Sequence, residues 1–542
     1  MIHDLWYKNA IVYSLDVETY LDADGDGIGD FEGLSRRLDY LEGLGVTALW
    51  LAPFQPSPRR DDGYDISDFY GVDKRFGSSG DFVEFMREAD SRGIRVLIDL
   101  VVNHTSNEHP WFRDEEHHDW YVWSKRRPAN WRSGVVFPGV QTSTWTFDKR
   151  AREYYFHRFY DFQPDLDMDN PRVREEVRRI MGFWLQLGVA GFRMDAVPFV
   201  LEKPPRGRGK PQIHFEYLAE FRELLQWRVG DAVLLGEANV VPQDTQPYFG
   251  SGHGLHMMFN FWVNQHLWLA LATGDVRPLA RALRATKKLP PTAQWAQFLR
   301  NHDELDLGRL SAADRKQVFD AFAPEASMQL YGRGIRRRPA PMLGDSKRLQ
   351  LAYSIVLSLP GTPVLRYGDE IGMGENLRLK ERNAIRTPMQ WSDEPNGGFS
   401  IADTVVRTPI DRGPYGYAQV NVEDQRRDSS SLLQWTARML RLRKQCPEIG
   451  WGDWRVVPSG TSAVLAIEYS WRGSTIVCVH NLVDDPRQAK LELGGGTLSN
   501  LVDAEQIEAD LRDVHHVLIE AYGYRWFRLG TVTPALARDV VG

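Results

Sequence analysis

Short runs of β-branched and apolar residues alternate along most of the chain with longer amphipathic stretches. Eight of these runs predict strands, at residues 10–17, 46–53, 94–102, 191–197, 232–239, 255–261, 295–302 and 362–370. Amphipathic stretches that close with glycine, at 31–45 and 171–188, predict helices before the second and fourth strands. Eight strand and helix units in alternation indicate an α/β fold of the (β/α)8 TIM barrel class.

Two regions break this alternation. Residues 105–163 are polar and rich in aromatic clusters, and they are too numerous for a simple loop, so they predict an inserted subdomain after the third strand. Beyond about residue 450 the chain changes to short alternating runs separated by Gly, Asp and Pro, which predicts a C-terminal antiparallel β-sandwich at 450–542. The barrel is therefore assigned to residues 1–104 and 164–449.

Composition narrows the class of protein. The 542 residues carry 66 basic and 73 acidic side chains, a net charge of -7 without a long basic run, which argues against nucleic acid as a partner. We find neither a signal peptide nor a run of about eighteen apolar residues, so we expect a cytoplasmic protein with no membrane partner. The two cysteines, Cys446 and Cys478, have no metal-ligand spacing and are expected to be buried thiols.

The chain is rich in aromatic residues, with 18 Trp, 20 Tyr and 25 Phe. Many of them lie beside Asp, Arg and His, and flat apolar faces next to hydrogen-bonding groups suit sugar rings. The alternative is that large aromatics fill a large core. Composition alone does not choose between these interpretations.

Polar residues end four of the predicted strands, where the active site of a (β/α)8 barrel forms. They are Asp99, Asn103 and His104 in DLVVNH; Arg193 and Asp195 in GFRMDA; Glu237 in LLGEAN; and His302 and Asp303 in LRNHDE. Any one of them could be a helix cap or a surface acid. Four such strand ends at one rim favour an active site instead.

Three converging carboxylates suit retaining glycoside hydrolysis, in which a nucleophile and an acid/base lie about 5–5.5 Å apart. Arg193 precedes Asp195 by two residues on the same strand face, so we expect it to hold that carboxylate ionised and oriented. Glu237 follows the apolar run VLLG, and we expect burial to raise its pKa so that it carries a proton.

The motifs DLVVNH, GFRMDAV, LLGEAN and NHDE, in this order and spacing, resemble those of the α-amylase superfamily, glycoside hydrolase family 13. This resemblance implies that Asp195 is the nucleophile, Glu237 the general acid/base and Asp303 the group that stabilises the transition state. It also places His104 and His302 as donors to sugar hydroxyls. Asp99 and Arg193 are assigned to the same substrate site.

The segment RRDDGYDISD adds two residues to the expected donor pocket. Tyr64 offers a stacking face for the first glucose. Asp61 resembles the acid that caps the non-reducing end together with an arginine in exo-acting members, and we expect Arg386 of RTPMQW to be its partner; the alternative is a loop acid. A capped pocket favours a glucosidase or a glucosyl-transfer enzyme over an endo-acting amylase.

The segment DADGDGIGD predicts a calcium loop. It places Asp22, Asp24, Asp26 and Asp30 at positions 1, 3, 5 and 9 of an EF-hand-like loop, with the Ile28 carbonyl at position 7. Position 12 is Gly33, so the loop is not an EF-hand. It resembles the calcium loop after the first barrel strand of the oligo-1,6-glucosidase and trehalose synthase groups.

The resemblance implies a second calcium, which tethers the inserted subdomain in many relatives. Its matching oxygen donors here are Asn103, Asp165 and Glu202. Asn103 and Asp165 could instead serve structurally without a metal. No organic cofactor is expected.

Over nearly the whole chain, including the calcium loop, HPWF and RTPMQWS, the resemblance is strongest to the trehalose synthase family. That family isomerises maltose to trehalose through a covalent glucosyl-enzyme, and the released glucose turns in a closed site and attacks through its anomeric hydroxyl. Two departures fall on the acceptor side: the stretch EKPPRGRGKPQIHFEYLAEF at 202–221, and Asp167 with Met168 after QPDL.

Three hypotheses follow. The first is a trehalose-synthase-type glucosyl mutase with some hydrolysis; the second is an α-glucosidase or transglucosidase that acts on another α-glucoside or acceptor. The third is an inactive barrel that serves as a binding subunit, which the three retained acids and the lack of a membrane segment argue against. The expected partners are small α-linked disaccharides such as maltose or trehalose, and the sequence leaves open whether the chain forms a homo-oligomer.

Overall fold

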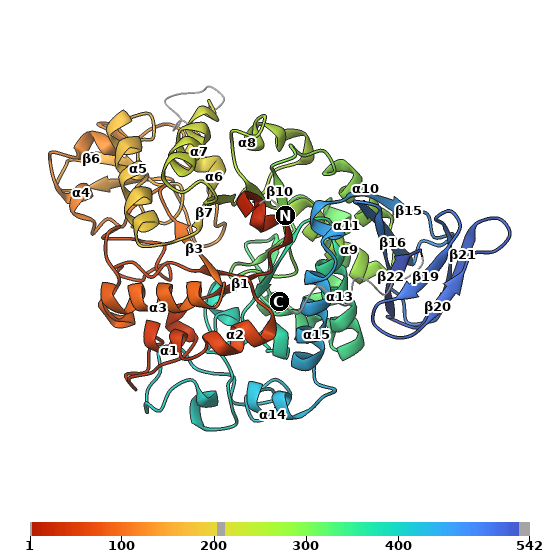
Figure 1. Ribbon diagram of the computed structural model, residues 1–542. Coiled ribbons are helices and arrows are strands. Elements are labelled where there is room, and N and C mark those ends of the chain that lie inside the picture. Colours follow the sequence, from red (N-terminus) through yellow and green to blue (C-terminus); the bar gives the residue numbers. More distant parts are fainter. Residues whose placement is uncertain (1–2, 203–211, 531–542) are drawn as a thin grey trace.

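A closed barrel of eight parallel strands organises the computed structural model, which describes residues 3–202 and 212–530 (Figure 1). Around the barrel the strands are β1 Val12–Leu15, β2 Ala48–Leu51, β3 Arg95–Leu100, β7 Gly191–Met194, β8 Val233–Gly236, β9 Met257–Phe259, β10 Gln294–Phe298 and β14 Thr362–Arg366. Each overlaps one of the eight predicted runs. The predicted (β/α)8 fold is confirmed.

Helices surround the barrel. The longer ones are α3 Ser79–Ser91, α5 Pro171–Gln186, α7 Glu216–Arg228, α9 Phe261–Thr273, α10 Arg277–Ala285, α11 Ala312–Phe322, α13 Ser346–Ser358 and α15 Leu432–Lys444. The shorter ones are α4 Pro110–Arg113, α6 Val197–Leu201, α8 Gln246–Phe249, α12 Pro339–Leu343, α14 Val422–Arg427 and α16 Glu448–Trp451. The helix predicted at 171–188 is present as α5, with Asn170 capping its start and proline in its first turn.

The helix predicted at 31–45 is two helices, α1 Phe31–Ser35 and α2 Leu38–Leu44. Arg37 between them leaves the helical region, with φ -110° and ψ 5°. Asp30 caps α1 by accepting a hydrogen bond from the Gly33 amide. Gly45 ends α2 at φ 103°, a conformation that glycine adopts without steric cost.

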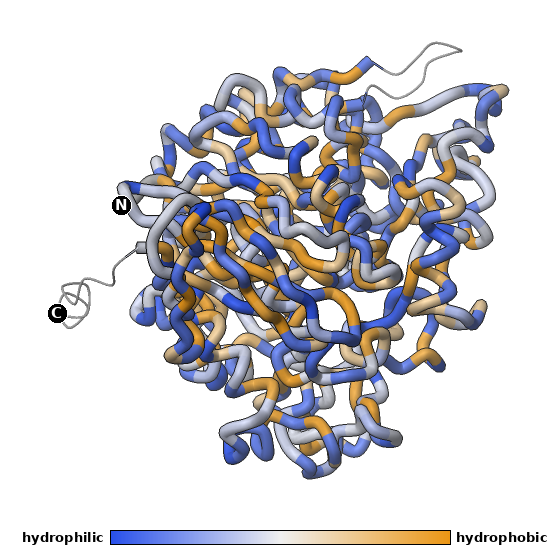
Figure 2. The backbone as a smooth tube through the Cα atoms, turned by 90° about the vertical axis from the view of Figure 1, so that its right-hand side faces the viewer, coloured by the Kyte–Doolittle hydropathy of each residue, from blue (hydrophilic) through white to orange (hydrophobic). Residues whose placement is uncertain are grey.

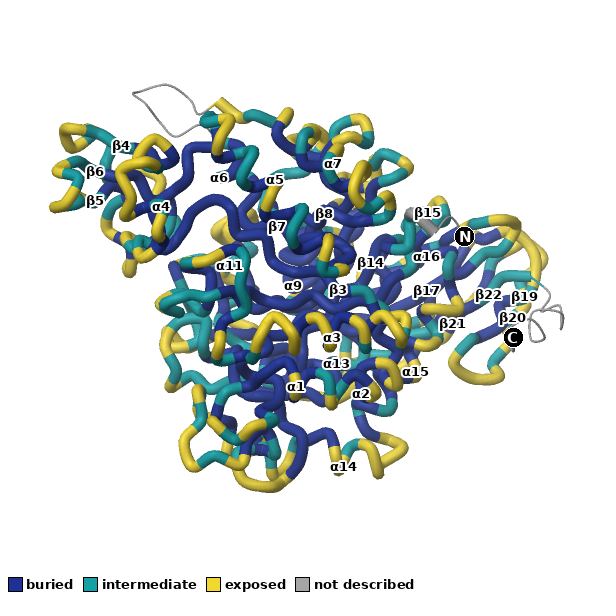
Figure 3. The backbone as a smooth tube through the Cα atoms, turned by 60° about the vertical axis from the view of Figure 1, so that its left-hand side comes forward, coloured by how far each residue is buried: buried dark blue, intermediate teal, exposed yellow. Residues whose placement is uncertain are grey.

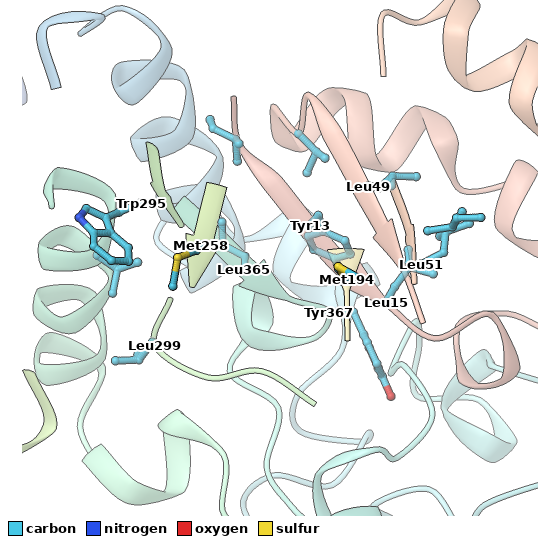
Figure 4. Close-up of a cluster of buried hydrophobic side chains, with 14 of the residues drawn as sticks. Tyr13, Leu15, Leu49, Leu51, Met194, Met258, Trp295, Leu299, Leu365 and Tyr367 are labelled. Atoms are coloured by element: carbon cyan, nitrogen blue, oxygen red, sulfur yellow. The ribbon is translucent and has the colours of Figure 1, made fainter. Parts of the chain in front are cut away.

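Side chains alternate between the two faces of the barrel strands, and both faces are buried. Val12, Trp50 and Leu97 belong to the cluster inside the barrel, whereas Tyr13 and Leu49 pack outside it against the helices (Figure 4). The strands therefore lie in the buried centre, while exposed segments lie at the loops and on the outer sides of helices such as α3 (Figure 3). This alternation decides which residues beyond each strand end point to the barrel axis.

The insertion after β3 contains a small antiparallel sheet in the order β4, β6, β5. Its strands are β4 Trp123–Ser124, β5 Trp145–Asp148 and β6 Glu153–Phe156. Val122, Trp145 and Phe156 form its hydrophobic cluster, and it lies beside α5 in Figure 1. The proposed limits of this subdomain at 105 and 163 remain predictions.

The C-terminal part is formed by two antiparallel sheets, and hydrophobic and hydrophilic segments alternate closely along its chain (Figure 2). One sheet has the order β15 Asp453–Val457, β16 Val464–Trp471, β17 Ser474–Asn481, β22 Tyr524–Leu529, β19 Thr497–Asn500, β20 Gln506–Glu508, and the other pairs β18 Arg487–Glu492 with β21 Val514–Ile519. Val477, Ala489, Val517 and Phe527 belong to one cluster shared by the two sheets. The additional antiparallel sheets are thus present as expected, and the boundary at 450 remains a prediction.

Cys446 and Cys478 are both buried and are not disulfide-bonded, as expected. Within residues 3–202 and 212–530, none of the helices combines the length and the apolar character that crossing a bilayer requires.

Candidate active site

The register of three neighbouring strands brings the predicted acids to one point at the barrel mouth. Asp99 on β3 lies opposite Arg193 on β7, and Arg193 lies opposite Leu235 on β8. Because interior positions recur every second residue, Asp195 and Glu237 come next on the inner face. Their amides extend the strand pairing, from Asp195 to the Leu100 carbonyl at 3.2 Å and from Glu237 to the Met194 carbonyl at 3.0 Å.

Arg193 is fully buried and joins three carboxylates. Its Nη1 lies 2.6 Å from Asp99 Oδ1 and 2.6 Å from Asp195 Oδ1, and its Nη2 lies 2.8 Å from Glu237 Oε2. A planar guanidinium with a fixed set of donors can hold several carboxylates in one geometry. The predicted contact between Arg193 and Asp195 is present, and the contact with Glu237 is an addition that the strand pattern did not reveal.

Asp99 lies deeper than the other acids. Its Oδ2 accepts hydrogen bonds from Trp50 Nε1 at 3.0 Å and from the Tyr64 hydroxyl at 3.2 Å. Burial raises its pKa to about 6, although Arg193 acts in the opposite direction. Asp99 therefore holds Arg193 and Tyr64 in place from below the pocket.

Burial also raises the pKa values of the two acids expected to carry the chemistry. The pKa of Glu237 rises to about 7, because desolvation and the charges of Asp195 and Asp303 outweigh the attraction of Arg193. The pKa of Asp195 rises to about 6, again chiefly through burial, opposed by Arg193. Near pH 7 the site therefore favours an ionised Asp195 beside a Glu237 that still carries its proton much of the time, the division of roles needed for a nucleophile and an acid.

Ala196 follows Asp195 in a left-handed backbone conformation, with φ 46° and ψ 42°. Its amide points at Glu237 Oε2, at 3.3 Å. Non-glycine residues in this region are uncommon and cluster at functional sites, where surrounding structure holds them. Sequence reasoning missed this residue, because an alanine carries no signal of its backbone angles.

Asp303 is held by two arginines. Arg382 Nη1 and Arg386 Nη2 lie 2.7 and 3.0 Å from its Oδ1. Burial opposes the ionisation of Asp303, but these positive charges outweigh that penalty and hold its pKa below the ordinary value. Asp303 is therefore an anion at the pH where Glu237 is partly protonated.

The structure corrects the expected partner of Asp61. Arg382, not Arg386, contacts Asp61, with Nη2 2.8 Å from Asp61 Oδ1. Arg386 is buried and pairs instead with Asp62 Oδ2 at 2.6 Å and with Asp303. The two arginines lie four residues apart, at and just after η8 Glu381–Ile385. Because they are so close in sequence, only the tertiary structure decides which of them reaches Asp61.

Tyr64 and the two predicted histidines form one side of the site. The Tyr64 ring stacks on His302 with centroids 5.4 Å apart, and its hydroxyl lies 2.7 Å from His302 Nε2. His104 Nε2 lies 3.0 Å from the Tyr64 carbonyl. Burial lowers the pKa of His104 to about 4 and lowers that of His302 well below its ordinary value, so both imidazoles are neutral and able to donate one hydrogen bond.

These groups line a cavity of about 430 Å³, a size in the range of about 300–1,000 Å³ found for small-molecule sites. Seven predicted residues line it: Asp61, Tyr64, His104, Asp195, Glu237, His302 and Asp303. Asp99, Arg193 and Arg386 lie behind the wall and act through their neighbours. The structure thus brings the three predicted catalytic acids together.

The cavity has lining residues that the sequence reasoning did not name, among them Phe137, Phe159, Glu304, Arg333 and Arg382. The two phenylalanines come from the aromatic-rich insertion. Its composition was visible in the sequence, but not which of its aromatic residues line the cavity. Glu304 follows Asp303 directly, and burial raises its pKa to about 7. Asp167 and Met168 do not line the cavity, and residues 203–211 of the divergent acceptor stretch lie outside the described residues.

The first predicted calcium loop brings three of its carboxylates together. Ligand oxygens of Asp22, Asp24 and Asp30 lie within 4.8 Å of one another, a hard oxygen set that suits Ca²⁺. Asp26 is not part of this group and accepts a hydrogen bond from the Ile28 amide at 2.8 Å. Asp22 also accepts from the Gly27 amide at 2.8 Å, so the loop is already shaped by its own backbone.

A basic side chain lies at the second predicted calcium site. Arg158 supplies the positive charge there: its Nη2 lies 2.7 Å from Glu202 Oε1, and its amide donates to Asp165 Oδ1 at 2.8 Å. The guanidinium also lies over the Phe199 ring at 4.7 Å. Asp165 also interacts with the Asn103 side chain and with the charge of Glu202, so the three predicted donors lie near one another, and the second calcium site stays a prediction.

Comparison with known families agrees with this geometry. The α-amylase catalytic domain family matches residues 17–332 and 336–452, and a sucrose hydrolase-like C-terminal domain matches residues 473–528. The chain belongs to the α-amylase family, glycoside hydrolase family 13. The prediction of an enzyme of this family that acts on α-glucosides is confirmed.

Individual relatives include several trehalose synthases. The trehalose synthase of Thermus thermophilus is 44% identical over 488 residues, 88% of this chain, which spans half of that longer protein. The trehalose synthase of Pimelobacter sp. is 39% identical over 97% of this chain and 96% of its own. An oligo-1,6-glucosidase of Parageobacillus thermoglucosidasius is 33% identical over 84% of this chain and 86% of its own.

Among solved structures, the trehalulose synthase MutB superposes with a TM-score of 0.79 at 25% identity, covering 97% of this chain and 100% of that one. An α-amylase from H. orenii gives a TM-score of 0.76 at 28% identity, covering 96% and 99%.

Proposed function

We propose that the protein is a retaining glucosyl mutase of the trehalose synthase type, which isomerises maltose to trehalose with some hydrolysis. The observation that carries this proposal is the joint placement of Asp195, Glu237 and Asp303 in one cavity that the ion pair of Asp61 with Arg382 also lines. In the proposed function this pair caps the non-reducing end of the bound glucose, which suits the removal of a single sugar.

In the first step Asp195 attacks the anomeric carbon of the bound glucose, and the bond to the leaving oxygen breaks. Glu237 gives its proton to that oxygen, so the second glucose leaves as a neutral alcohol and Glu237 becomes a carboxylate. Arg193 stays bound to Asp99 and orients both acids throughout. Asp303, held as an anion by Arg382 and Arg386, accepts hydrogen bonds from sugar hydroxyls and stabilises positive charge at the ring.

In the second step the Glu237 carboxylate takes a proton from the attacking hydroxyl. If the anomeric hydroxyl of the retained glucose attacks, trehalose forms; if water attacks, the product is glucose. The ratio of the two products therefore depends on how well water is excluded while the glucosyl-enzyme exists. The residues that enclose the cavity, and not the catalytic acids, therefore determine whether the enzyme acts as a mutase or a hydrolase.

The second candidate is an α-glucosidase or transglucosidase acting on another short α-glucoside or acceptor. The observation that favours it is the divergent stretch at 202–221, which falls where the acceptor would be enclosed, together with the similarity to an oligo-1,6-glucosidase. This alternative uses the same acids and the same first step.

We also propose that Ca²⁺ is bound by the loop of Asp22, Asp24 and Asp30, with a structural role. The support is the convergence of their carboxylate oxygens. The loop packs against Ser400, whose hydroxyl donates to Asp22 Oδ2 at 2.5 Å, so an ion there would tie the first barrel loop to a segment from the far end of the barrel sequence.

Product analysis on maltose, sucrose, trehalose and isomaltose tests the proposal. Trehalose as the main product from maltose is the expected result, and glucose alone would exclude a mutase and leave the glucosidase. Asp195→Asn serves as the control in both cases, because it should abolish turnover while the far-UV circular dichroism spectrum stays unchanged. Turnover retained by this variant would refute the nucleophile assignment.

A further inference from the structure

Three segments that are distant in sequence meet at the donor end of the cavity, and one carboxylate joins them. Glu381 Oε1 accepts a hydrogen bond from the Tyr331 hydroxyl at 2.9 Å and another from the Tyr160 hydroxyl at 3.4 Å. Tyr160 belongs to the end of the insertion, and Tyr331 lies in the turn between β12 Gln329–Leu330 and β13 Gly334–Ile335. We call Tyr160, Tyr331 and Glu381 the clasp.

Two of the three clasp residues have a left-handed backbone. Tyr331 has φ 56° and Glu381 has φ 43°. This region is sterically unfavourable for residues with a side chain, and such conformations persist where the surrounding structure compensates for them. The hydrogen bond between these two side chains joins the two left-handed positions.

The turn that carries Tyr331 is also attached to the insertion beside the cavity. The Tyr331 ring packs on Phe137 with centroids 4.9 Å apart, and the Tyr160 ring packs on Phe137 at 5.0 Å. Arg333 Nη1 donates to the Val136 carbonyl at 2.9 Å. Phe137 lines the cavity, so the clasp fixes part of its wall.

Glu381 immediately precedes Arg382, the residue that closes the donor end. Arg382 bridges Asp61 and Asp303 at 2.8 and 2.7 Å, and its guanidinium lies over the Phe137 ring at 5.1 Å. The backbone of Glu381 therefore sets the point from which Arg382 leaves the chain. Burial raises the pKa of Tyr331 above its ordinary value, so its hydroxyl remains a hydrogen-bond donor at any physiological pH.

We propose that Tyr160, Tyr331 and Glu381 are positioning residues that hold Arg382 and Phe137 over the donor end, and thereby keep water from the glucosyl-enzyme. This inference rests on the proposed double displacement at Asp195. It means that residues other than the catalytic acids control the ratio between transfer and hydrolysis. The clasp residues do not contact the substrate themselves and act on it through Arg382 and Phe137.

The test measures separately how fast the glucosyl-enzyme forms and whether its glucosyl group is then transferred to glucose or to water. With p-nitrophenyl α-glucoside and added glucose as acceptor, released nitrophenol counts the glucosyl-enzyme formed, and disaccharide product counts transfer. In Tyr331→Phe we expect the ratio of hydrolysis to transfer to rise about fivefold, the effect of one lost hydrogen bond. The rate of nitrophenol release should change less than this ratio, because the acids are untouched.

Tyr70→Phe is the matched control. Its hydroxyl donates to Glu176 Oε1 at 2.6 Å, another tyrosine and glutamate pair, but neither residue lines the cavity. We expect this variant to keep the wild-type ratio. An unchanged ratio in Tyr331→Phe, or an equal rise in both variants, would overturn the proposal.

Two variants at Glu381 complete the test. Glu381→Ala should raise the hydrolysis ratio at least as much as Tyr331→Phe, whereas Glu381→Gln keeps an acceptor oxygen and should restore most of the transfer. If Glu381→Ala does not fold, the tyrosine variants and Glu381→Gln still decide. If the wild type forms glucosyl-enzyme but makes no trehalose from maltose, the mutase assignment fails, while the ratio with added glucose still tests the clasp.

Discussion

The protonation of Glu237 is the property of this site that is most open to measurement. Moving its pKa from 4.5 to about 7 corresponds to about 3 kcal/mol against ionisation, at about 1.4 kcal/mol for each pH unit. In the proposed first step Glu237 must be protonated, so its contribution is present below pH about 7 and is lost above it. Asp195 must be ionised, and its pKa of about 6 sets the acid limb. The plot of kcat/KM against pH should be a narrow bell between these values, which belong to the coupled pair.

Glu237→Gln removes the group that titrates on the alkaline limb. On maltose, whose leaving alcohol needs a proton, activity should fall roughly 10²–10⁴-fold. On α-glucosyl fluoride, whose leaving group needs none, the first step should survive and its alkaline limb should disappear. Covalent glucosyl-enzyme should then accumulate, because Glu237 is also the base of the second step, and intact-protein mass spectrometry detects it.

A Glu237→Gln variant that keeps the alkaline limb with the fluoride, or that loses maltose and fluoride activity equally, would refute the role of Glu237 as the acid. Glu304→Gln is the control for a neighbouring buried acid. Its pKa is also raised to about 7, but the charges that act on it are those of Arg382, Asp303, Asp306 and Arg333, so its substitution should leave the alkaline limb in place.

Three further predictions concern stability. Burial raises the pKa of Glu370 to about 7 despite hydrogen bonds from Tyr13 and Tyr40, so its stabilising contribution is present below pH about 4.5 and is lost as the pH rises through about 7. Glu370→Gln should therefore raise the free energy of unfolding above pH 7 by up to about 3 kcal/mol and change it little at pH 4. Equal effects at both pH values in denaturant titrations would contradict this prediction. Arg158→Ala should lower the free energy of unfolding by about 2–4 kcal/mol, since it leaves Glu202 without its cation; a loss below about 0.5 kcal/mol, as at an ordinary surface position, would show that the pair is not structural. Ca²⁺ at about 100 times its dissociation constant should stabilise the protein by about 2.7 kcal/mol and so raise its Tm. Asp24→Ala should remove that rise. A Tm that changes with neither calcium nor chelator would rule out the loop site.

The alternation of apolar and polar residues was sufficient to predict the barrel. Both faces of its strands are buried, so the runs around Val12, Leu49 and Leu97 are mostly apolar and stand out from the amphipathic helices between them. The same period placed Arg193 and Asp195 on one face, because side chains two residues apart on a strand point the same way. These properties are local, and a single sequence carries them.

Contacts between distant segments were decided only by the tertiary structure. The sequence contains Arg382 and Arg386 four residues apart, and both pair with Asp303, but only the path of the chain brings Arg382 to Asp61 and leaves Arg386 with Asp62. In the same way, nothing local in the sequence indicated that Arg158 would pair with Glu202, one of the oxygen donors predicted for the second calcium. The sequence by itself determined the barrel and the acids at its mouth, because strand period and strand ends are local. The partners of those acids depended on which side chains the fold brings within about 3 Å, and charge pairing at that range has no local signature.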